Sequence, residues 1–161
     1  MNVLTTRFGT IGVADDACLS FPSGILGFPA LRRFVLLKTT DLGLFRWLQS
    51  AEVPALVCLV CNPRLVLHDY AVRVQAQLLA DIHVTRADQA DLLVMVSYPL
   101  DKSLMTADLQ RPIVCNRDFR LAKHLSLPAG SYSRAHRVFG DQPVASAQVS
   151  LPPDHPLELS A

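Results

Sequence analysis

The stretch "PALVCLVCNP" (residues 54–63) decides the fold class, because a valine-rich run lies between a proline and an Asn-Pro turn signal. Such a short apolar run is typical of a buried strand rather than a helix. The runs "FVLLKTT" (residues 34–40), "LLVMVSY" (residues 92–98) and "PIVCN" (residues 112–116) are similarly short. They too are bounded by residues that favour turns. The chain has 161 residues and is 50% hydrophobic, which is enough for one globular domain.

The segment "YAVRVQ" (residues 70–75) alternates apolar and polar side chains, as a half-buried strand does. Only two segments look helical, residues 76–80 and residues 86–91, and Thr85 would cap the start of the second. Strands and helices do not alternate, which argues against a parallel sheet. The sequence therefore predicts a mainly β fold: a small antiparallel β-barrel-like domain with one or two short helices, over residues 1–140.

The remaining residues, 141–161, read "DQPVASAQVSLPPDHPLELSA" and contain four of the eleven prolines. They form no periodic apolar face, so we expect a flexible C-terminal tail. An alternative for the closing "HPLELSA" is a docking peptide.

The lengths of the apolar runs also help to predict the cellular compartment of the protein. None approaches the roughly 20 residues that cross a bilayer. The start, "MNVLTTRFGT", has no basic region followed by a long apolar run. We therefore expect a cytoplasmic protein, whose four cysteines stay reduced.

The C-x-x-C spacing of Cys58 and Cys61 raises the question of a metal or redox site. In a strand these side chains point to opposite faces, and their α-carbons lie about 10 Å apart at roughly 3.3 Å per residue. A disulfide needs less than about 7 Å, and no second pair supplies the other ligands of a zinc ion. We therefore expect buried thiols, with no metal and no cofactor.

Catalytic motifs are also missing from the sequence. The five histidines are dispersed, and none lies in a nucleophile or metal motif. Gly24 and Gly27 lack the spacing of a phosphate loop and are interpreted as turn glycines. We expect no enzymatic activity.

Charge is distributed unevenly, although the formal net charge is only +1. Residues 69–108 carry six acids against three bases, whereas residues 111–137 carry six bases against Asp118 alone. Two explanations are open. The charges cluster by chance on a solvated surface, or they form a polar interface that steers a charged partner.

Five blocks, in order, resemble the flagellar assembly factor FliW family. They are "FPSGILGFPALRRFVLL" (residues 21–37), "FRWLQS" (residues 45–50), "NPRLVLHDY" (residues 62–70), "MTADLQRPIVCN" (residues 105–116) and "HLSLPAGSYSRAH" (residues 124–136). The resemblance implies a small non-catalytic β-barrel of the cytoplasm that binds unassembled flagellin. It also implies that the protein, when free of flagellin, binds and antagonises the RNA-binding translational regulator CsrA, so that flagellin messenger RNA is translated.

The matched blocks contain the candidate partner-binding residues. Loops at strand ends commonly carry binding residues. On this basis the candidates are Gln49, Ser50, Asn62, Pro63, Asp69, Tyr70, Thr106, Asp108 and Asn116. For Asn62-Pro63, turn chemistry alone is an equal alternative.

Other aromatic residues and some departures from the family pattern also matter. Trp47 is expected in the core, whereas either Phe21 or Phe28 is a candidate exposed anchor. Asp108 stands where the family commonly has Asn, and Lys123-His124 where a Gln is usual. These departures put equal affinity for the two partners in question.

A rival hypothesis is a direct RNA-binding β-barrel that uses the basic region of residues 111–137. Stacking and phosphate contacts would then come from Phe119, Arg120, Lys123, Tyr132, Arg134 and Arg137. On the main hypothesis we expect no direct contact with nucleic acid or membrane. We expect a monomer, and paired edge strands would be the route to a dimer.

Overall fold

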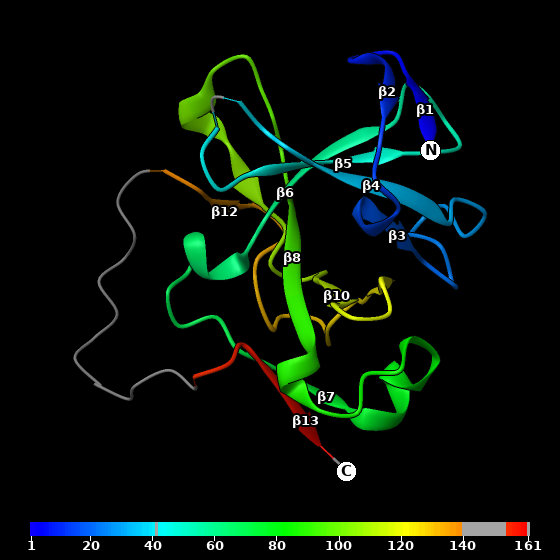
Figure 1. The fold of residues 1–161 in the computed structure, drawn as a ribbon. Coiled ribbons are helices and arrows are strands. Elements are labelled where there is room, and N and C mark those ends of the chain that lie inside the picture. Colours follow the sequence, from blue (N-terminus) through cyan, green and yellow to red (C-terminus); the bar gives the residue numbers. More distant parts are fainter. Residues whose placement is uncertain (41, 140–153, 161) are drawn as a thin grey trace.

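Seven strands close into a barrel in the computed structural model, which describes residues 1–40, 42–139 and 154–160 (Figure 1). The ring order is β10-β11-β3-β4-β5-β6-β8, and β8 pairs back with β10. These strands are β3 (Cys18–Ser20), β4 (Arg33–Lys38), β5 (Arg46–Ser50), β6 (Val57–Cys61), β8 (Ala90–Val96), β10 (Ile113–Asn116) and β11 (Leu121–His124). Closure leaves the ring without a free edge.

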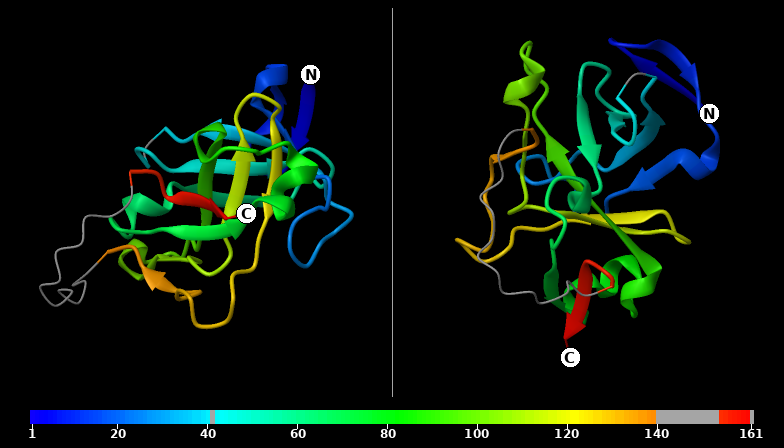
Figure 2. Two further views of the ribbon diagram at one scale, coloured as in Figure 1. Left: turned by 90° about the horizontal axis from the view of Figure 1, so that it is seen from below. Right: turned by 90° about the vertical axis from the view of Figure 1, so that its left-hand side faces the viewer.

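Shorter strands surround the ring. The hairpin of β1 (Asn2–Thr5) and β2 (Gly9–Gly12) lies at one end of the molecule. At the opposite end, β7 (Val72–Gln75) lies beside β13 (Leu157–Ser160) (Figure 2). Two more strands, β9 (Thr106–Ala107) and β12 (His136–Arg137), extend the sheet beyond β8.

Side-chain alternation along the ring strands produces two apolar layers. Every ring strand sends side chains into a cluster that includes Leu19, Phe34, Leu48 and Ile113, which is the barrel interior. The outward-facing side chains, together with β7 and the connecting segments, form a second cluster around Tyr70. The predicted mainly β, barrel-like fold is therefore confirmed.

Among the strands of the described residues, two pairs are parallel and the others are antiparallel. The β11–β3 contact is limited to Leu121 and Ser20, where it closes the barrel seam. The other parallel pair is β7–β13. Neither pair is a βαβ unit, because several other strands lie between the two paired strands along the chain.

Cys58 and Cys61 lie on opposite faces of a strand, as the sequence predicted. Cys58 packs against the barrel interior and Cys61 lies in the outer cluster, so their side chains occupy opposite faces of β6. All four cysteines are free thiols. Burial raises the pKa of the Cys61 thiol to about 12, which removes the thiolate that metal binding and disulfide exchange need.

The helices of the described residues are tighter than α-helices, and the second predicted helix is shorter than expected, whereas the first extends to Ile82. All are 3₁₀ turns: η1 (Asp15–Ala17), η2 (Pro63–Leu65), η3 (Ala76–Ile82), η4 (Ala87–Gln89) and η5 (Lys102–Leu104). The expectation that Thr85 caps a helix over residues 86–91 is wrong. The Gln89 carboxamide instead accepts the Thr85 and Arg86 amides at 2.9 and 3.1 Å, and Asp91 already lies in β8.

The C-terminal residues correct the expectation of a flexible tail in part. Leu157–Ser160 form β13, and Leu157 is buried. The reason is that Leu157 and Leu159 alternate with polar residues, so they supply an apolar face to the outer cluster. Residues 141–153 lie outside the described part of the chain, so the tail expected there stays a prediction.

No helix among the described residues is long and apolar enough to span a membrane.

His124 on β11 holds the loop of residues 21–28 against the barrel. Its Nδ1 accepts the Leu26 amide at 3.1 Å, and its Nε2 lies 3.1 Å from the Arg111 carbonyl oxygen. An accepting Nδ1 requires a neutral ring. Burial accordingly holds the pKa of His124 below its ordinary value of 6.5.

The depressed pKa of His124 predicts a pH-dependent stability. Below about pH 6.5 the unfolded chain protonates this ring before the folded protein does. The contribution of His124 to the free energy of unfolding is thus full above about pH 6.5 and is lost as the pH falls toward the folded pKa. Urea unfolding at pH 7.5 and 5.5 should show a larger loss for the native chain than for His124→Gln. Equal losses would contradict this assignment.

Candidate functional site

Several of the predicted site residues are buried, and most of their polar atoms bond within the chain, although Gln49 Oε1 has no hydrogen-bond partner. At the end of β5, the Gln49 carboxamide donates to the carbonyl oxygens of Ser50, Pro54 and Leu56 at 3.0 to 3.1 Å. The Ser50 hydroxyl accepts the Glu52 and Val53 amides at 3.0 and 2.9 Å. Both side chains are fully buried and shape the β5–β6 turn.

Tyr70 and Asn116 are likewise structural. The Tyr70 hydroxyl donates to the Leu109 carbonyl oxygen at 2.7 Å, while its ring packs on Tyr132 with centroids 4.5 Å apart. The Asn116 amide donates to the carbonyl oxygens of Ile82 and His83 at 2.9 and 3.2 Å. These two buried side chains join distant loops to the barrel.

The Asn62-Pro63 pair shows the turn chemistry that was the alternative reading. Asn62 caps η2 by accepting the Arg64 amide at 2.9 Å, and Pro63 occupies the first turn. Pro63 is buried, whereas Asn62 and Asp69 are exposed. Only these two exposed residues and the half-buried Thr106 and Asp108 keep side chains within reach of a partner.

Thr106 and Asp108 come together beside one surface pocket. It has a volume of about 510 Å³. Its walls come from β5, β6, β8 and β9 and from segments distant in sequence. The side chains that define it here, called the arginine–aromatic surface below, are Arg7, Trp47, Tyr98, Thr106, Asp108, Arg111 and Arg134.

A stack of rings and guanidinium groups forms the centre of this surface. Trp47 and Tyr98 meet edge to face with centroids 5.3 Å apart. The Arg7 guanidinium lies 4.4 Å from the Trp47 ring centroid and 5.7 Å from that of Tyr98. Such distances allow a cation–π attraction. Trp47 is only 8% exposed, so its predicted place in the core is confirmed, although its edge still borders the pocket.

Asp108 orders the basic side of the surface. Its carboxylate accepts the Gln110 and Arg111 backbone amides, each at 3.2 Å, and pairs with Arg111 Nε at 2.7 Å. An Asn at this position would turn its NH₂ group toward the Arg111 guanidinium. That group donates hydrogen bonds and could not accept one from the guanidinium. Asp108, where the sequence resemblance led us to expect Asn, therefore has a structural role, because its carboxylate holds Arg111 in place.

Lys123, the other departure that involves charge, is also used internally. Its ammonium group donates to the Leu78 carbonyl oxygen at 2.7 Å and lies 3.2 Å from Asp81.

Exposed leucines adjoin the arginine–aromatic surface. Tyr98 and Thr106 lie at the two ends of the β8–β9 connection, whose tip carries Leu100 and Leu104. Leu100 is fully exposed and Leu104 is 57% exposed. Trp47, Tyr98 and the arginines of this face are residue types that are enriched at protein–protein hot spots.

The sequence did not indicate Arg7 and Tyr98 as site residues. Arg7 lies in the β1–β2 turn, outside the blocks that resemble the family, and Tyr98 appeared only as the end of a strand. Phe28 is 57% exposed and Phe21 is fully buried, so one of this pair is exposed, as expected.

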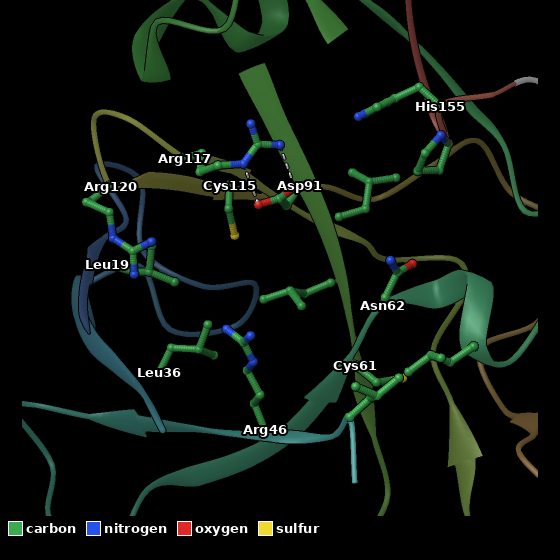
Figure 3. A pocket seen from close by; sticks show the side chains of 15 residues that line it. Leu19, Leu36, Arg46, Cys61, Asn62, Asp91, Cys115, Arg117, Arg120 and His155 are labelled. Atoms are coloured by element: carbon green, nitrogen blue, oxygen red, sulfur yellow. Dashed lines mark hydrogen bonds and ion pairs between the residues drawn. The ribbon is translucent and has the colours of Figure 1, made fainter. Parts of the chain in front are cut away.

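A second pocket, also of about 510 Å³, adjoins one end of the barrel (Figure 3). Arg46, Arg117 and Arg120 border it above a floor that includes Leu19 and Leu36 (Figure 3). The guanidinium of Arg117 binds both carboxylate oxygens of Asp91, at 2.8 and 3.1 Å. Asn62 is the one predicted site residue that lines it.

The residues of the RNA hypothesis are not assembled into one stacking platform. The Tyr132 hydroxyl is bonded to the Ala71 backbone at 2.9 Å, and its ring packs on Tyr70. Phe119 instead packs near His83, with centroids 5.1 Å apart. Base stacking needs free aromatic faces beside the cations, and no Phe, Tyr or Trp lines the pocket of Arg117 and Arg120.

Metal binding can also be assessed from side-chain positions. Within residues 1–40, 42–139 and 154–160, no three His, Cys, Asp or Glu side chains are grouped closely enough to hold an ion.

The fold and surface define a small closed β-barrel whose most distinctive feature is a basic, aromatic face. The sequence model of the family described as FliW protein matches residues 2–138. The chain therefore belongs to the FliW family. The proteins of this family in the comparisons are flagellar assembly factors, and none is described as an enzyme.

Individual relatives support this assignment. The chain is 38% identical to the flagellar assembly factor FliW of Geobacter sulfurreducens over 139 residues, which cover 86% of this chain and 87% of that protein. It is 34% identical to that of Bdellovibrio bacteriovorus, with 86% and 79% covered. A crystal structure of the flagellar assembly factor FliW superposes with a TM-score of 0.80 at 29% identity, covering 88% of this chain and 99% of that one.

Proposed function

We propose that this protein is a cytoplasmic flagellar assembly factor that binds unassembled flagellin. When free of flagellin, it binds CsrA and relieves the repression of flagellin translation. The observation that carries the proposal is the family match over residues 2–138, which spans the whole barrel. Flagellin and CsrA must then each weaken the binding of the other, because coupling between two ligands is reciprocal.

We place the partner-binding region at the arginine–aromatic surface. Three arginines and one aspartate line this surface, so it carries a net positive charge that would steer an acidic partner segment. The Trp47 and Tyr98 rings supply apolar area next to these charges. Thr106 and Asp108 belong to this region, so these two of the predicted residues remain candidates for direct contact.

Buried candidates act differently in this proposal. Gln49, Ser50, Pro63, Tyr70 and Asn116 support the loops and do not touch the partner. The exposed Asn62 and Asp69 stay candidate contacts at the turn between β6 and β7. The closed ring itself has no free edge, but strands outside it, such as β12 and β13, do, so a monomer stays an expectation.

Charge reversal at Arg7 tests this placement. Arg7 is exposed and lies over the Phe8 and Trp47 rings in cation–π contact, so Arg7→Glu should leave the fold intact. We expect flagellin to bind Arg7→Glu roughly ten-fold more weakly, as for the loss of an interface arginine. Calorimetric titration with flagellin measures the change.

The matched control is Arg86→Glu. Arg86 is also exposed and pairs with Asp88 at 3.3 Å, but it lies at the N-cap of η4, an element that contacts β13. We expect its affinity to stay within about two-fold of the native value. Native affinity in Arg7→Glu, or equal losses in the two variants, would contradict the proposed surface.

A further inference from the structure

The C-terminal segment adds a strand to β7. β13 runs parallel to β7, from Leu157 opposite Val72 to Ser160 opposite Gln75. The Val72 amide donates to the Pro156 carbonyl oxygen at 2.7 Å. Within the described ranges, β7 has no other strand partner, and both strands lie at the end of the molecule far from the β1–β2 hairpin (Figures 1 and 2).

The contacts of β13 define what this edge recognises. Leu157 is buried in the outer cluster, and Leu159 packs against the same cluster. Between them, Glu158 points outward and meets Arg73 Nη2 at 2.9 Å. The edge therefore selects an extended peptide with two aliphatic side chains that flank a carboxylate.

Hydrogen bonds also hold the residues just before β13 in place. His155 Nε2 lies 3.0 Å from the Ala90 carbonyl oxygen, and its Nδ1 accepts the Leu157 amide at 3.1 Å. Arg64 donates to the Asp154 carbonyl oxygen at 3.3 Å.

The barrel does not need this segment to close. The ring of seven strands is complete without β13, and the family match ends at residue 138. Leu157 is the only β13 side chain that is buried, and the Arg73–Glu158 pair is mostly exposed. Detaching β13 thus removes few core contacts, while it exposes the backbone groups of β7.

We propose that the edge of β7 is a strand-accepting site for an extended aliphatic–acidic–aliphatic peptide of a partner protein, which the chain's own C-terminal segment occupies until it is displaced. A tethered segment competes at an effective concentration on the order of millimolar. Weak ligands therefore do not displace the segment. A peptide with the same aliphatic–acidic–aliphatic pattern displaces it if that peptide binds β7 more tightly. This site is separate from the arginine–aromatic surface and does not depend on the identity of the flagellar partners.

A peptide-binding experiment on the full-length chain tests the site. The double substitution Leu157→Asp and Leu159→Asp places charges against the outer cluster and releases the segment. The probe is a fluorescein-labelled peptide of residues 154–161, DHPLELSA, and its anisotropy is measured. We expect the double variant to bind it at least ten-fold more tightly than the native chain does. A peptide with aspartate in place of both leucines is the control and should not bind.

Arg73 provides a charge test in the same assay. Arg73→Glu, added to the double variant, should weaken binding of DHPLELSA about three-fold. A DHPLKLSA peptide should bind this chain better than DHPLELSA does. Equal binding of the two peptides would overturn the assigned contact.

Hydrogen exchange on the native chain supplies a readout without substitution. The Val72 amide, bonded to Pro156, should exchange at least 100-fold faster than ring amides such as that of Val94, because β13 opens locally. Equal protection would overturn displacement, as would a folded double variant that binds the peptide no better than the native chain.

Discussion

Gly24→Ala should be among the most destabilising single substitutions in this chain, with a loss of at least about 3 kcal/mol in the free energy of unfolding. Gly24 has a φ of 70°, which costs a side chain about 1 kcal/mol. A β-carbon there would also overlap Pro29, lying 2.5 Å from its α-carbon and 2.6 Å from its carbonyl carbon. The obstacle is backbone, so the loop of residues 21–28 must move.

Gly27→Ala is the matched control. Gly27 has a φ of 87°, but a β-carbon there would meet nothing within 4 Å. It should therefore lose only the conformational term, about 1 kcal/mol. Thermal unfolding distinguishes the two, since 3 kcal/mol corresponds to roughly 10 °C in a domain of this size. Equal shifts for both variants would contradict the overlap with Pro29.

Asn116→Ala should cost about 3 kcal/mol, because it removes a buried side chain that bonds on both sides. Its Nδ2 donates to Ile82 and His83, while its Oδ1 accepts the Asp118 and Phe119 amides at 3.1 and 3.2 Å. Alanine would leave these backbone groups without their partner in a buried place. Urea unfolding measures the loss.

Asn62→Ala serves as the comparison, because Asn62 makes one capping bond to Arg64 and is exposed. About 1 kcal/mol is expected there. A loss at Asn116 no larger than that at Asn62 would show that the buried network does not stabilise the fold as described.

The strands were predictable because their pattern is local. In β6 and β8, valines and other apolar residues meet turn signals at both ends, and the period of two assigns Cys58 and Cys61 to opposite faces. Closure of the ring was predicted only in outline, because it depends on which strands pair. Single-sequence patterns do not encode the β8–β10 register or the short β11–β3 seam.

The short helices and the last strand were harder to predict. The second predicted helix is only a 3₁₀ turn, Ala87–Gln89, and Gln89 rather than Thr85 supplies its capping bonds. The strand Leu157–Ser160 lies in proline-rich surroundings, and its partner β7 is more than 80 residues away. Composition alone therefore favoured a tail.

Which of the predicted site residues contact a partner stays a prediction. Family-like motifs select residues without distinguishing contact from support, and burial made that distinction here. Gln49 and Asn116 turned out to be loop anchors, whereas Thr106 and Asp108 border a surface pocket. Arg7 joins that pocket from the β1–β2 turn, a proximity that only the folded chain creates.

The central claim is that one barrel exchanges two protein partners, and isothermal titration calorimetry tests it most directly. Flagellin from the same cell is titrated into the purified chain, first alone and then with CsrA present at saturation; the reverse titration follows. We predict that flagellin binds with a micromolar or lower dissociation constant. Each partner should lower the affinity of the chain for the other by the same factor. A chain that binds neither protein, or binds both with no mutual effect, would contradict the account.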